Sequence, residues 1–576
     1  MPRIRKIEIE NFRGIREFSW VPSAGINCLI GPGDSGKSTV LDAIDLCLGA
    51  RRTAQFTDAD FHNLDVTKPI RISLTIGELD DALKTIDGYG MFLRGFRAAT
   101  GEIEDEPERD AETVLTLTLT VTGDLEPNWT LESERAAAQN LTRNLNWSDR
   151  ARIAPTRIEG LGDYNLGWRR GSVLNRLSEE RPDASAALAE AARNARSAFG
   201  DGAKEQLGET LKMVADTARD LGIPVGGGVK ALLDFHSASF SGGTISLHDE
   251  GGVPLRSLGL GSARLLVAGL QRKAADRSTI ILVDELEHGL EPHRIIRFLG
   301  ALGAKETRPP LQAFITTHSP VALRELSGSQ LFVMRQIDTK HQVWNVGTED
   351  GIQGTIRLFP DAFLASSVLV CEGASEVGLV RGLDQFRATR GDPSINSLSV
   401  GLVDTGGRGA DRPFHRAQAL QTLGYRTAVF RDDDKKPSED VELAFQAAGG
   451  RTIKWREGQA LEDDLFLSLT DEGVNKLIEY AIELHGEHLI NNHIKSVSDN
   501  AKDLPAIRSD AEHAGYSRDN RAILGRAART KAGWFKSVTW MEEAGRNIIG
   551  PDLVDADAGF WAIVESIFAW ARASGE

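Results

Sequence analysis

The sequence predicts an α/β protein made of two successive α/β parts. Three observations support this: short apolar strands alternate with helical segments, a glycine-rich loop at 31–38 joins a strand to a helix, and carboxylates follow two buried strands in the second half. With 576 residues, 41% hydrophobic and 26% charged, the composition is that of an ordinary globular protein. It excludes a disordered chain, a fibrous repeat and a disulfide-stapled mini-protein.

The charge balance is unusual, because 67 Lys and Arg against 83 Asp and Glu give a formal net charge of −16. Taken alone, such a surface repels polyanions and argues against nucleic acid or anionic membranes as partners. No apolar run approaches the ~20 residues of a membrane span, and the N-terminus lacks the apolar core of a signal peptide, so a cytoplasmic protein with no membrane partner is expected. Cys28, Cys47 and Cys371 lie in apolar stretches and are expected to be buried free thiols.

The first half begins with alternating strands. Apolar and charged residues alternate from Ile4 to Ile9, and a second apolar strand is predicted at 26–30. Two further alternating segments, 70–76 and 114–121, predict antiparallel strands. The acidic stretch between them, 101–110, is predicted to be a solvated loop.

Four parts are predicted along the chain. Ala, Leu, Glu and Arg at helical spacing from about 171 to 234 indicate a helical insertion, and such helix pairs often make dimer contacts. A new buried strand near 368 places the main boundary at 360, and a polar helical stretch at about 471–518 interrupts the part that follows. The predicted parts are therefore 1–170, 171–234, 235–360 and 361–576.

Residues 31–38 match the pattern G-x-x-x-x-G-K-[ST] between a predicted strand and a predicted helix. The glycines let backbone N–H groups approach phosphate oxygens, and the helix N-terminus favours anions. Lys37 is expected to reach the β- and γ-phosphates of a nucleotide, and Ser38 to bind Mg²⁺. The predicted nucleotide-binding residues here are Gly31, Gly33, Asp34, Ser35, Gly36, Lys37, Ser38 and Thr39.

A later apolar strand, 279–283, ends in two carboxylates. Asp284 is expected to hold Mg²⁺ through water, and Glu285 to orient or deprotonate an attacking water. A strand with an acidic end is the simpler interpretation. It leaves unexplained the Leu-Glu-His-Gly-Leu-Glu-Pro run that follows and the next strand, after which His318 is placed to sense a γ-phosphate.

A glycine-rich segment before these carboxylates opens a helix, and its Ser257, Gly259 and Gly261 could bind the phosphate of a nucleotide held by a second subunit. Four elements thus follow one another along the chain: the glycine-rich loop at 31–38, this glycine-rich segment, the carboxylates after the strand at 279–283, and His318. In this order, and with Ile-Glu-Asn-Phe-Arg-Gly at 9–14, they resemble the ATP-binding-cassette (ABC) heads of the RecF and structural-maintenance-of-chromosomes (SMC) type. The resemblance implies ATP as the cofactor and a dimer that closes on nucleotide. The chain departs from that group at Gly33-Asp34, where Asn-Gly is usual, and its insertion lacks the heptads of a coiled-coil rod.

Carboxylates also gather in the second half. Glu372 follows a buried strand, Glu376 lies four residues later near a helix start, and Asp432 and Asp434 follow the strand at 426–430. Parallel strands bring their C-terminal ends to one edge, where carboxylates repel unless a hard cation such as Mg²⁺ or Mn²⁺ neutralises them. For a single residue an acidic loop end is the commoner explanation, but E-G-x-x-E together with D-x-D favours a metal site.

This arrangement resembles the Toprim domain of topoisomerases, primases and certain nucleases. An ABC head followed by Toprim is the layout of the OLD (overcoming lysogenization defect) family of nucleases, and the length and layout are most similar to the Gabija class of anti-phage nucleases. The resemblance implies divalent metals bound by Glu372, Glu376, Asp432 and Asp434, with looser contributions from Asp404 and Glu462. It also implies that Lys536 or Lys531 stabilises the transition state, with the choice between them open.

The expected function is an ATP-regulated, Mg²⁺- or Mn²⁺-dependent DNA endonuclease in anti-phage defence. Two alternatives stay open: a non-catalytic, RecF-like repair ATPase that binds DNA, and a nuclease acting on RNA. Basic residues interleaved with aromatics, at 150–176 with Tyr164 and Trp168 and at 518–536 with Trp534 and Phe535, are candidate DNA contacts, so the net charge does not exclude DNA. The resemblance further implies a homo-oligomer, a dimer or larger, and a separately encoded helicase partner.

Overall fold

The computed structural model describes residues 2–51, 53–158, 165–166, 172–177, 190, 193–194, 207–213, 247–248, 250–251, 254–275, 279–337, 339–407, 409–530 and 533–573. It divides the chain into two compact units, the first with Met1–Asn27 and Ser38–Thr316, the second with Cys28–Lys37 and Thr317–Glu576. The boundary expected at 360 thus lies within the second unit, and most of the insertion expected at 171–234 lies outside the described residues.

A seven-stranded antiparallel sheet belongs to the first unit, with the order β2-β1-β4-β7-β5-β6 and β8 also paired to β7. Its strands are β1 (Arg3–Phe12), β2 (Ile15–Trp20), β4 (Ile70–Gly77), β5 (Leu93–Arg97), β6 (Glu102–Glu104), β7 (Glu112–Val121) and β8 (Pro127–Glu132). The antiparallel strands predicted at 70–76 and 114–121 are confirmed as β4 and β7. The loop prediction for 101–110 is wrong in part, because β6 pairs with β5 there and Arg97 binds the carboxylates of Glu104 and Glu108.

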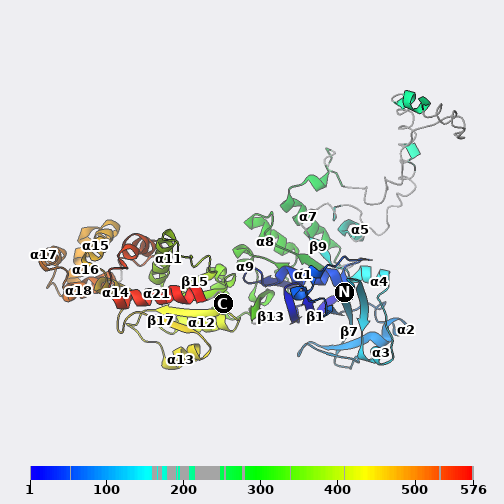
Figure 1. Cartoon of the computed structure of the whole chain (residues 1–576), viewed down its shortest axis with the longest axis horizontal. Helices are drawn as coiled ribbons and strands as arrows, with labels where there is room; N and C mark the ends of the chain where they lie inside the picture. The colour runs from blue at the N-terminus through cyan, green and yellow to red at the C-terminus, as the bar shows by residue number, and fades with distance from the viewer. Residues whose placement is uncertain are drawn as a thin grey trace. The chain divides into compact units, whose positions relative to one another are not determined.

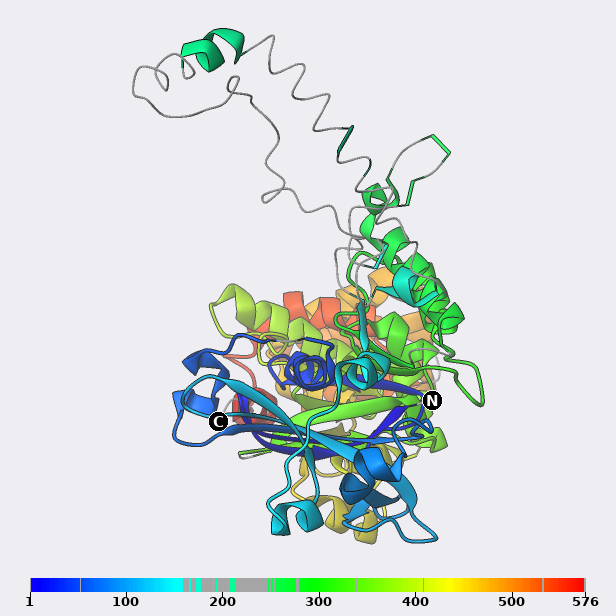
Figure 2. The same ribbon diagram turned by 90° about the vertical axis from the view of Figure 1, so that its right-hand side faces the viewer.

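Helix α1 (Lys37–Leu48) covers one face of this sheet, as the dark blue helix in Figures 1 and 2 shows. The Cys47 thiol donates to the backbone carbonyls of Ile72 (3.5 Å) and Leu117 (3.4 Å). Trp129 Nε1 donates to the Leu46 carbonyl at 3.1 Å. These contacts fix α1 on the sheet. The prediction of buried free thiols is confirmed for all three cysteines.

Three parallel strands complete the first unit: β9 (Thr156–Ile158), β10 (Ile280–Val283) and β11 (Gln312–Thr316), with β10 between the other two. Every residue of β10 and β11 is buried. Because these strands run parallel, the residues that follow β10 and β11 emerge at one edge. The helices of this unit are η1 (Asp58–Asp60), η2 (His62–Leu64), α2 (Ile86–Tyr89), η3 (Gly90–Phe92), α3 (Glu134–Ala138), α4 (Trp147–Ile153), α5 (Val173–Leu177), η5 (Leu255–Ser257), α7 (Leu260–Lys273) and α8 (Pro292–Ala301).

In the second unit, β3 (Ile26–Ile30) pairs in parallel with β12 (Leu331–Ile337), which pairs antiparallel with β13 (Lys340–Asn345). The strand predicted at 26–30 is therefore confirmed. The neighbouring helices are α9 (Pro320–Glu325), η6 (Gly328–Gln330), α10 (Asp350–Leu358) and η7 (Pro360–Phe363).

A four-stranded parallel sheet in the order β15-β14-β16-β17 follows. Its strands are β14 (Ser367–Cys371), β15 (Val400–Asp404), β16 (Arg426–Arg431) and β17 (Arg451–Lys454), connected by α11 (Ala374–Thr389), α12 (Arg412–Gln421) and α13 (Glu439–Ala447). From β14 the chain leads to its neighbour β15, and from β15 it returns past β14 to β16 and then β17. The direction of movement along the sheet therefore reverses after β15. Because such crossovers are right-handed, α11 lies on one face and α12 and α13 lie on the other. Figure 1 shows α11 and α13 on opposite sides. The ends of β14 and β16 adjoin at the switch point, where α/β proteins commonly bind ligands.

A helical array packs behind this sheet: α14 (Leu461–Ser468), α15 (Asp471–His485), α16 (Glu487–Val497), α17 (Leu504–Ala514), α18 (Arg518–Ala528), α19 (Val538–Ala544), η8 (Gly545–Ile549), α20 (Gly550–Asp552) and α21 (Ala558–Arg572). Helices α15 to α17 occupy the stretch at 471–518 for which helices are predicted. Trp455 stacks on Phe560 with 5.4 Å between ring centroids, and Phe466 meets Trp534 edge-on at 5.8 Å. Among the helices in the described ranges, none is long and apolar enough to cross a membrane.

Candidate functional site

The backbone of the glycine-rich loop requires glycine at its two ends. Gly31 has φ +131° and Gly36 has φ +85°, values that side chains rarely adopt. A Cβ at Gly31 would lie 2.5 Å from the Met334 carbonyl oxygen, so the close approach of β12 excludes any side chain. In the centre Asp34 has φ 57°, which aspartate tolerates better than most residues. The departure at Gly33-Asp34 therefore keeps a left-handed residue in the loop.

The ammonium of Lys37 lies inside this loop. Lys37 Nζ donates to the Gly31 carbonyl (3.2 Å), the Pro32 carbonyl (2.6 Å) and Ser35 Oγ (3.1 Å), and the residue is buried. Glycine-rich loops with the pattern G-x-x-x-x-G-K-[ST] present backbone N–H groups and one lysine to a phosphate. The neighbouring Thr39 is half-buried in the first turn of α1.

Within the first unit, the structure brings Ser38 and Asp284 together although 246 residues separate them. Ser38 Oγ donates to Asp284 Oδ1 at 2.9 Å. Thr316, the last residue of β11, donates from Oγ1 to the same oxygen at 2.6 Å and accepts from the Glu285 backbone N–H at 2.8 Å. Thr316 was not among the predicted site residues, yet it orients both carboxylate positions. A hydroxyl at the end of the strand next to β10 was the only sequence signal for it.

A buried arginine holds the loop after β10. The guanidinium of Arg264, in α7, donates to the backbone carbonyls of Asp284 (3.2 Å), Glu285 (3.1 Å) and His288 (2.6 Å). Burial lowers the pKa of Arg264, with nearby acidic groups opposing the shift. Glu285 has φ 47° and a largely exposed carboxylate. His318 is exposed two residues after β11.

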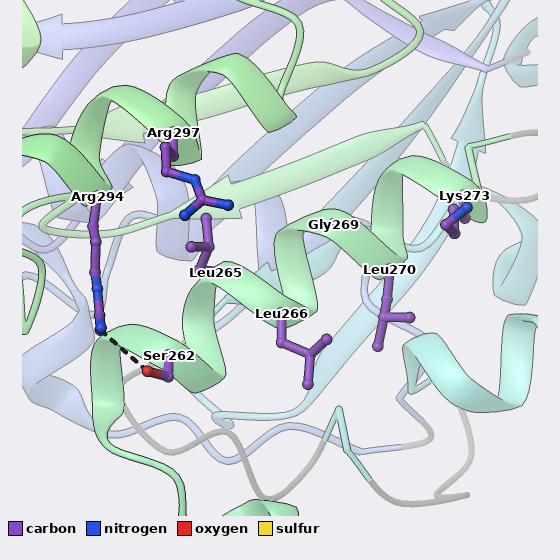
Figure 3. Close-up of a pocket in the computed structure, with 8 residues that line it drawn as sticks. All are labelled: Ser262, Leu265, Leu266, Gly269, Leu270, Lys273, Arg294 and Arg297. Atoms are coloured by element: carbon purple, nitrogen blue, oxygen red, sulfur yellow. Dashed lines mark hydrogen bonds between the residues drawn. The ribbon is translucent and has the colours of Figure 1, made fainter.

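The glycine-rich segment predicted to contact a second subunit's nucleotide lies at the start of α7: Ser257 and Gly259 precede the helix, and Gly261 is in its first turn. Ser257 and Gly259 are exposed, and a Cβ at Gly261 would lie 2.2 Å from the Gly289 carbonyl oxygen, so glycine permits the close approach of α7 to that loop. Figure 3 shows the outer side of the same helix, where Arg294 Nη1 of α8 donates to Ser262 Oγ at 3.1 Å. Half-buried leucines of α7 and cationic side chains line a groove of about 460 Å³ there.

The second candidate site lies at the switch point of the four-stranded sheet. Glu372 follows β14 and Asp432 follows β16, and the Asp432 N–H donates to Glu372 Oε2 at 3.1 Å. Two helices begin at this edge with carboxylates in their first turns: the Gly373 N–H donates to Glu376 Oε2 at 2.9 Å, and the Leu461 N–H, beside Glu462, donates to Asp432 Oδ1 at 2.9 Å. Helix N-termini stabilise the negative charge gathered here.

The electrostatics of this cluster are those of uncompensated acids. Burial raises the pKa of Glu376 to about 8, and the charge of Glu462 adds to the shift. Burial also raises the pKa of Asp432, with repulsion from Glu376, Glu462 and Glu372 contributing. The pKa values of Glu372 and Glu462 are raised as well, again mainly by burial. These four residues are called the carboxylate cluster below.

The predicted metal ligands are not preassembled. Among the residues that the structure describes, no three Asp, Glu, His or Cys side chains are placed to hold one metal ion. Asp404 ends β15, beside β14, and accepts from the Gly406 N–H at 2.6 Å. Asp434 accepts from Arg529 Nη1 at 3.2 Å.

Cationic side chains border the carboxylate cluster. Arg529 Nη1 also lies 3.2 Å from Asp463 Oδ2, and the charge of Lys536 offsets part of the rise that burial causes in the pKa of Glu462. Lys536 Nζ donates to the Arg529 carbonyl at 3.2 Å, whereas Lys531 lies outside the described residues. The loop before Lys536 is held by Trp534, whose Nε1 donates to His493 Nδ1 at 3.2 Å.

Several residues of the two predicted DNA-contact clusters are used inside the fold. Trp534 and Phe535 are fully buried, so the prediction that they meet bases is wrong: both rings fill the helical core. Arg150 is also buried, stacked over Trp129 with its Nε donating to the Gly49 carbonyl at 3.0 Å. Tyr164 and Trp168 lie outside the described residues.

Comparison with known proteins gives one family. Residues 26–324, just over half of the chain, match the model described as "AAA domain, putative AbiEii toxin, Type IV TA system".

Curated relatives match a short segment only. The DNA replication and repair protein RecF of Chlorobium phaeovibrioides is 47% identical over 45 residues, 8% of this chain and 12% of that protein. RecF of Prosthecochloris aestuarii is 39% identical over 61 residues, 11% and 16% of the two chains. The chain thus covers less than a fifth of the length of these relatives.

Solved structures give weak matches in overall shape. The SMC head domain from Thermotoga maritima has a TM-score of 0.30 and 14% identity, covering 60% of this chain and 99% of that one. The recombination mediator protein RecF has a TM-score of 0.29 and 11% identity, covering 59% and 98%.

Proposed function

The chain belongs to the AAA-domain family whose model matches residues 26–324, and on that premise we propose that it is an ATP-binding, divalent-metal-dependent DNA endonuclease regulated by its ATPase part. One observation carries the nuclease proposal: four carboxyl groups, buried Glu376 and Glu462 and half-buried Glu372 and Asp432, gather at the switch point of a parallel sheet and repel one another. The resemblance of this part to Toprim, and of the whole layout to OLD-family nucleases of the Gabija class, supports it.

Nucleotide chemistry in the proposal uses the phosphate loop. Lys37 exchanges its bonds to loop oxygens for the β- and γ-phosphates, and the Ser38–Asp284 pair holds Mg²⁺. Glu285 deprotonates or orients the attacking water, and His318 senses the γ-phosphate. Ser257, Gly259 and Gly261 serve a nucleotide held by a second copy of the chain.

The donor set of the carboxylate cluster fits Mg²⁺ or Mn²⁺. All its ligating atoms are oxygens, and their raised pKa values, caused mainly by burial and in part by repulsion between the acids, mean that the ionised forms need a cation beside them. In the proposal Glu372, Glu376, Asp432 and Asp434 hold the ions, with help from Asp404 and Glu462. Their side chains must turn to a common point, because no three are placed as ligands among the described residues. Bound ions would activate a water and stabilise the leaving oxygen of a phosphodiester.

The chain's own cations have separate tasks in this proposal. Lys536 or Lys531 neutralises the charge that develops on the phosphate, and Lys536 is supported by its influence on Glu462. Arg529 balances Asp434 and Asp463 at the rim. The resemblance further supports a homo-oligomer, a separately encoded helicase partner and a role in anti-phage defence.

Plasmid cleavage tests the nuclease assignment. With Mg²⁺ or Mn²⁺ we expect nicked or linear product, lost in Glu372→Ala and in Asp432→Ala but kept in Glu487→Ala, which removes an exposed carboxylate of α16. Full activity in Glu372→Ala or Asp432→Ala would refute the site. Supplying linear DNA and RNA in the same metal titration identifies the substrate class, and Lys37→Ala with and without ATP tells activation from inhibition.

A second candidate is a RecF-like ATPase that binds DNA without cutting it. The local identity to RecF favours this alternative. It predicts ATP-dependent DNA binding, intact plasmid under every metal condition and no effect of Glu372→Ala on binding. The buried, mutually repelling acids argue against it, because a binding scaffold gains nothing from them.

A further inference from the structure

A cationic hollow lies at the same sheet edge as the carboxylate cluster. The N-terminus of α12 follows β15 and the loop at 432–438 follows β16, so both emerge at the carboxyl edge of the sheet. Between them is a hollow of about 360 Å³ lined by Arg412, His415 and Lys436. All three side chains are exposed.

The wall of this hollow is held together by one carboxylate. Asp411 accepts from the Ser438 N–H at 2.6 Å and from Ser438 Oγ at 2.8 Å, which ties the loop after β16 to the start of α12. These bonds also hold the pKa of Asp411 below its usual range. Both oxygens of Asp411 are therefore used in the tether, and the cationic side chains line the hollow. Lys436 Nζ also lies 3.4 Å from Glu457 Oε1, but both side chains are exposed, and such a surface ion pair costs little to exchange for a phosphate.

The surrounding charges extend the cationic surface toward the carboxylate cluster. Arg416 lies one turn after Arg412, and burial and repulsion from Arg412 lower its pKa. The charge of Asp404 opposes this shift. Lys435 acts electrostatically on Glu372. In a chain of net charge −16, such a concentration of cations beside buried acids attracts an anion locally.

We propose that Arg412, His415 and Lys436 bind a backbone phosphate of DNA next to the carboxylate cluster. A guanidinium and an ammonium on opposite walls can each contact one phosphate, and the polar lining suits a hydrated anion. The subsite takes its DNA from the proposed function and holds the strand whose neighbouring phosphodiester enters the cluster.

The test measures DNA binding without cleavage. Fluorescence anisotropy of a labelled single-stranded DNA oligonucleotide, in chelator, compares wild type with Arg412→Ala/Lys436→Ala and with Arg390→Ala/Arg451→Ala. The control pair removes the same charge from the opposite edge, because Arg390 follows the C-terminus of α11 and Arg451 begins β17. We expect the first variant to bind about tenfold more weakly and its salt slope to fall by about 1 to 2, as losing one or two phosphate contacts requires. The control should match wild type.

Equal affinities in wild type and Arg412→Ala/Lys436→Ala, or equal losses in both double variants, overturn the subsite. Binding of RNA but not of DNA that is weakened in Arg412→Ala/Lys436→Ala overturns the choice of DNA. Saturable binding of inorganic phosphate in calorimetry, lost in Arg412→Ala/Lys436→Ala and without any effect on DNA binding, assigns the hollow to a free anion instead. DNA binding that is weakened in Arg412→Ala/Lys436→Ala, without metal-dependent cleavage by wild type, supports the subsite and refutes the nuclease. Metal-dependent cleavage that is unchanged in this double variant supports the nuclease and refutes the subsite.

Discussion

The backbone N–H of Asp432 donates to the carboxylate of Glu372, with 3.1 Å between N and Oε2. The two residues follow β14 and β16, which pair in register from Ser367↔Arg426 to Cys371↔Phe430. The bond holds one acidic side chain against the start of the other acidic loop. Their proximity is therefore set by strand pairing and does not depend on the helices around them.

Stability in chelator should fall as the pH rises, because of Glu376. The folded state keeps this proton up to about pH 8, whereas an unfolded chain releases it near the ordinary value of 4.5. Between those values the folded state binds more protons, so the free energy of unfolding decreases with pH by up to about 1.4 kcal/mol per pH unit. Chemical denaturation across this range should show a shallower slope for Glu376→Gln and an unchanged one for Glu487→Gln. Identical slopes for wild type and Glu376→Gln would contradict the assignment.

Thr316→Val should separate nucleotide binding from hydrolysis. The change deprives Asp284 Oδ1 of a donor and the Glu285 N–H of its acceptor, but leaves the phosphate loop intact. We expect the rate of ATP hydrolysis to fall by about 10- to 100-fold, as is usual for groups that orient metal ligands. The Kd of a fluorescent nucleotide should stay near wild type, and Thr316→Ser should restore hydrolysis. A valine variant as active as wild type would show that the hydroxyl has no such role.

Substitution by alanine should destabilise the protein at one glycine of the phosphate loop and have little effect at another. Gly31→Ala forces a side chain into φ +131° and against the Met334 carbonyl, which should destabilise the protein by about 2 kcal/mol or more. Gly33 has open space around its Cβ position, so Gly33→Ala should stay within about 0.5 kcal/mol of wild type. Denaturation midpoints measure both, and equal losses would argue against the described loop backbone.

Arg264→Met should loosen the loop after β10. Four backbone carbonyls, those of residues 284, 285, 286 and 288, lose their donor, at a cost of about 1 to 3 kcal/mol of unfolding free energy. Lys273→Met, an exposed change on the same helix, is the control and should cost less than about 0.5 kcal/mol. Hydrogen exchange of amides 284–288 should quicken in Arg264→Met alone; protection equal to that of wild type would count against the anchoring role.

The residues that follow predicted strands identify both candidate sites, the phosphate loop with Asp284 and the carboxylate cluster. Parallel strands bring Glu372 and Asp432 to one edge of the sheet whatever sequence lies between them. The same reasoning misses Arg264 and Thr316, whose contacts join segments that no periodicity relates. It also mistakes Trp534 and Phe535 for base contacts. A basic, aromatic-rich stretch looks alike whether its rings face solvent or a helical core. What decides is the packing of Trp534 against Phe466 of α14 and of Phe535 against Tyr480 of α15.

The order β15-β14-β16-β17 makes β14 and β16 interior strands and leaves β15 and β17 at the margins. Interior strands are hydrogen-bonded on both sides, so a deletion there would turn every following side chain to the other face. A segment after a marginal strand carries no such penalty, and the stretch from Asp404 to α12 is one of these. If the proposed DNA subsite is correct, lengthening or recharging that stretch would change the polyanion bound there, while the acids at the centre keep their spacing.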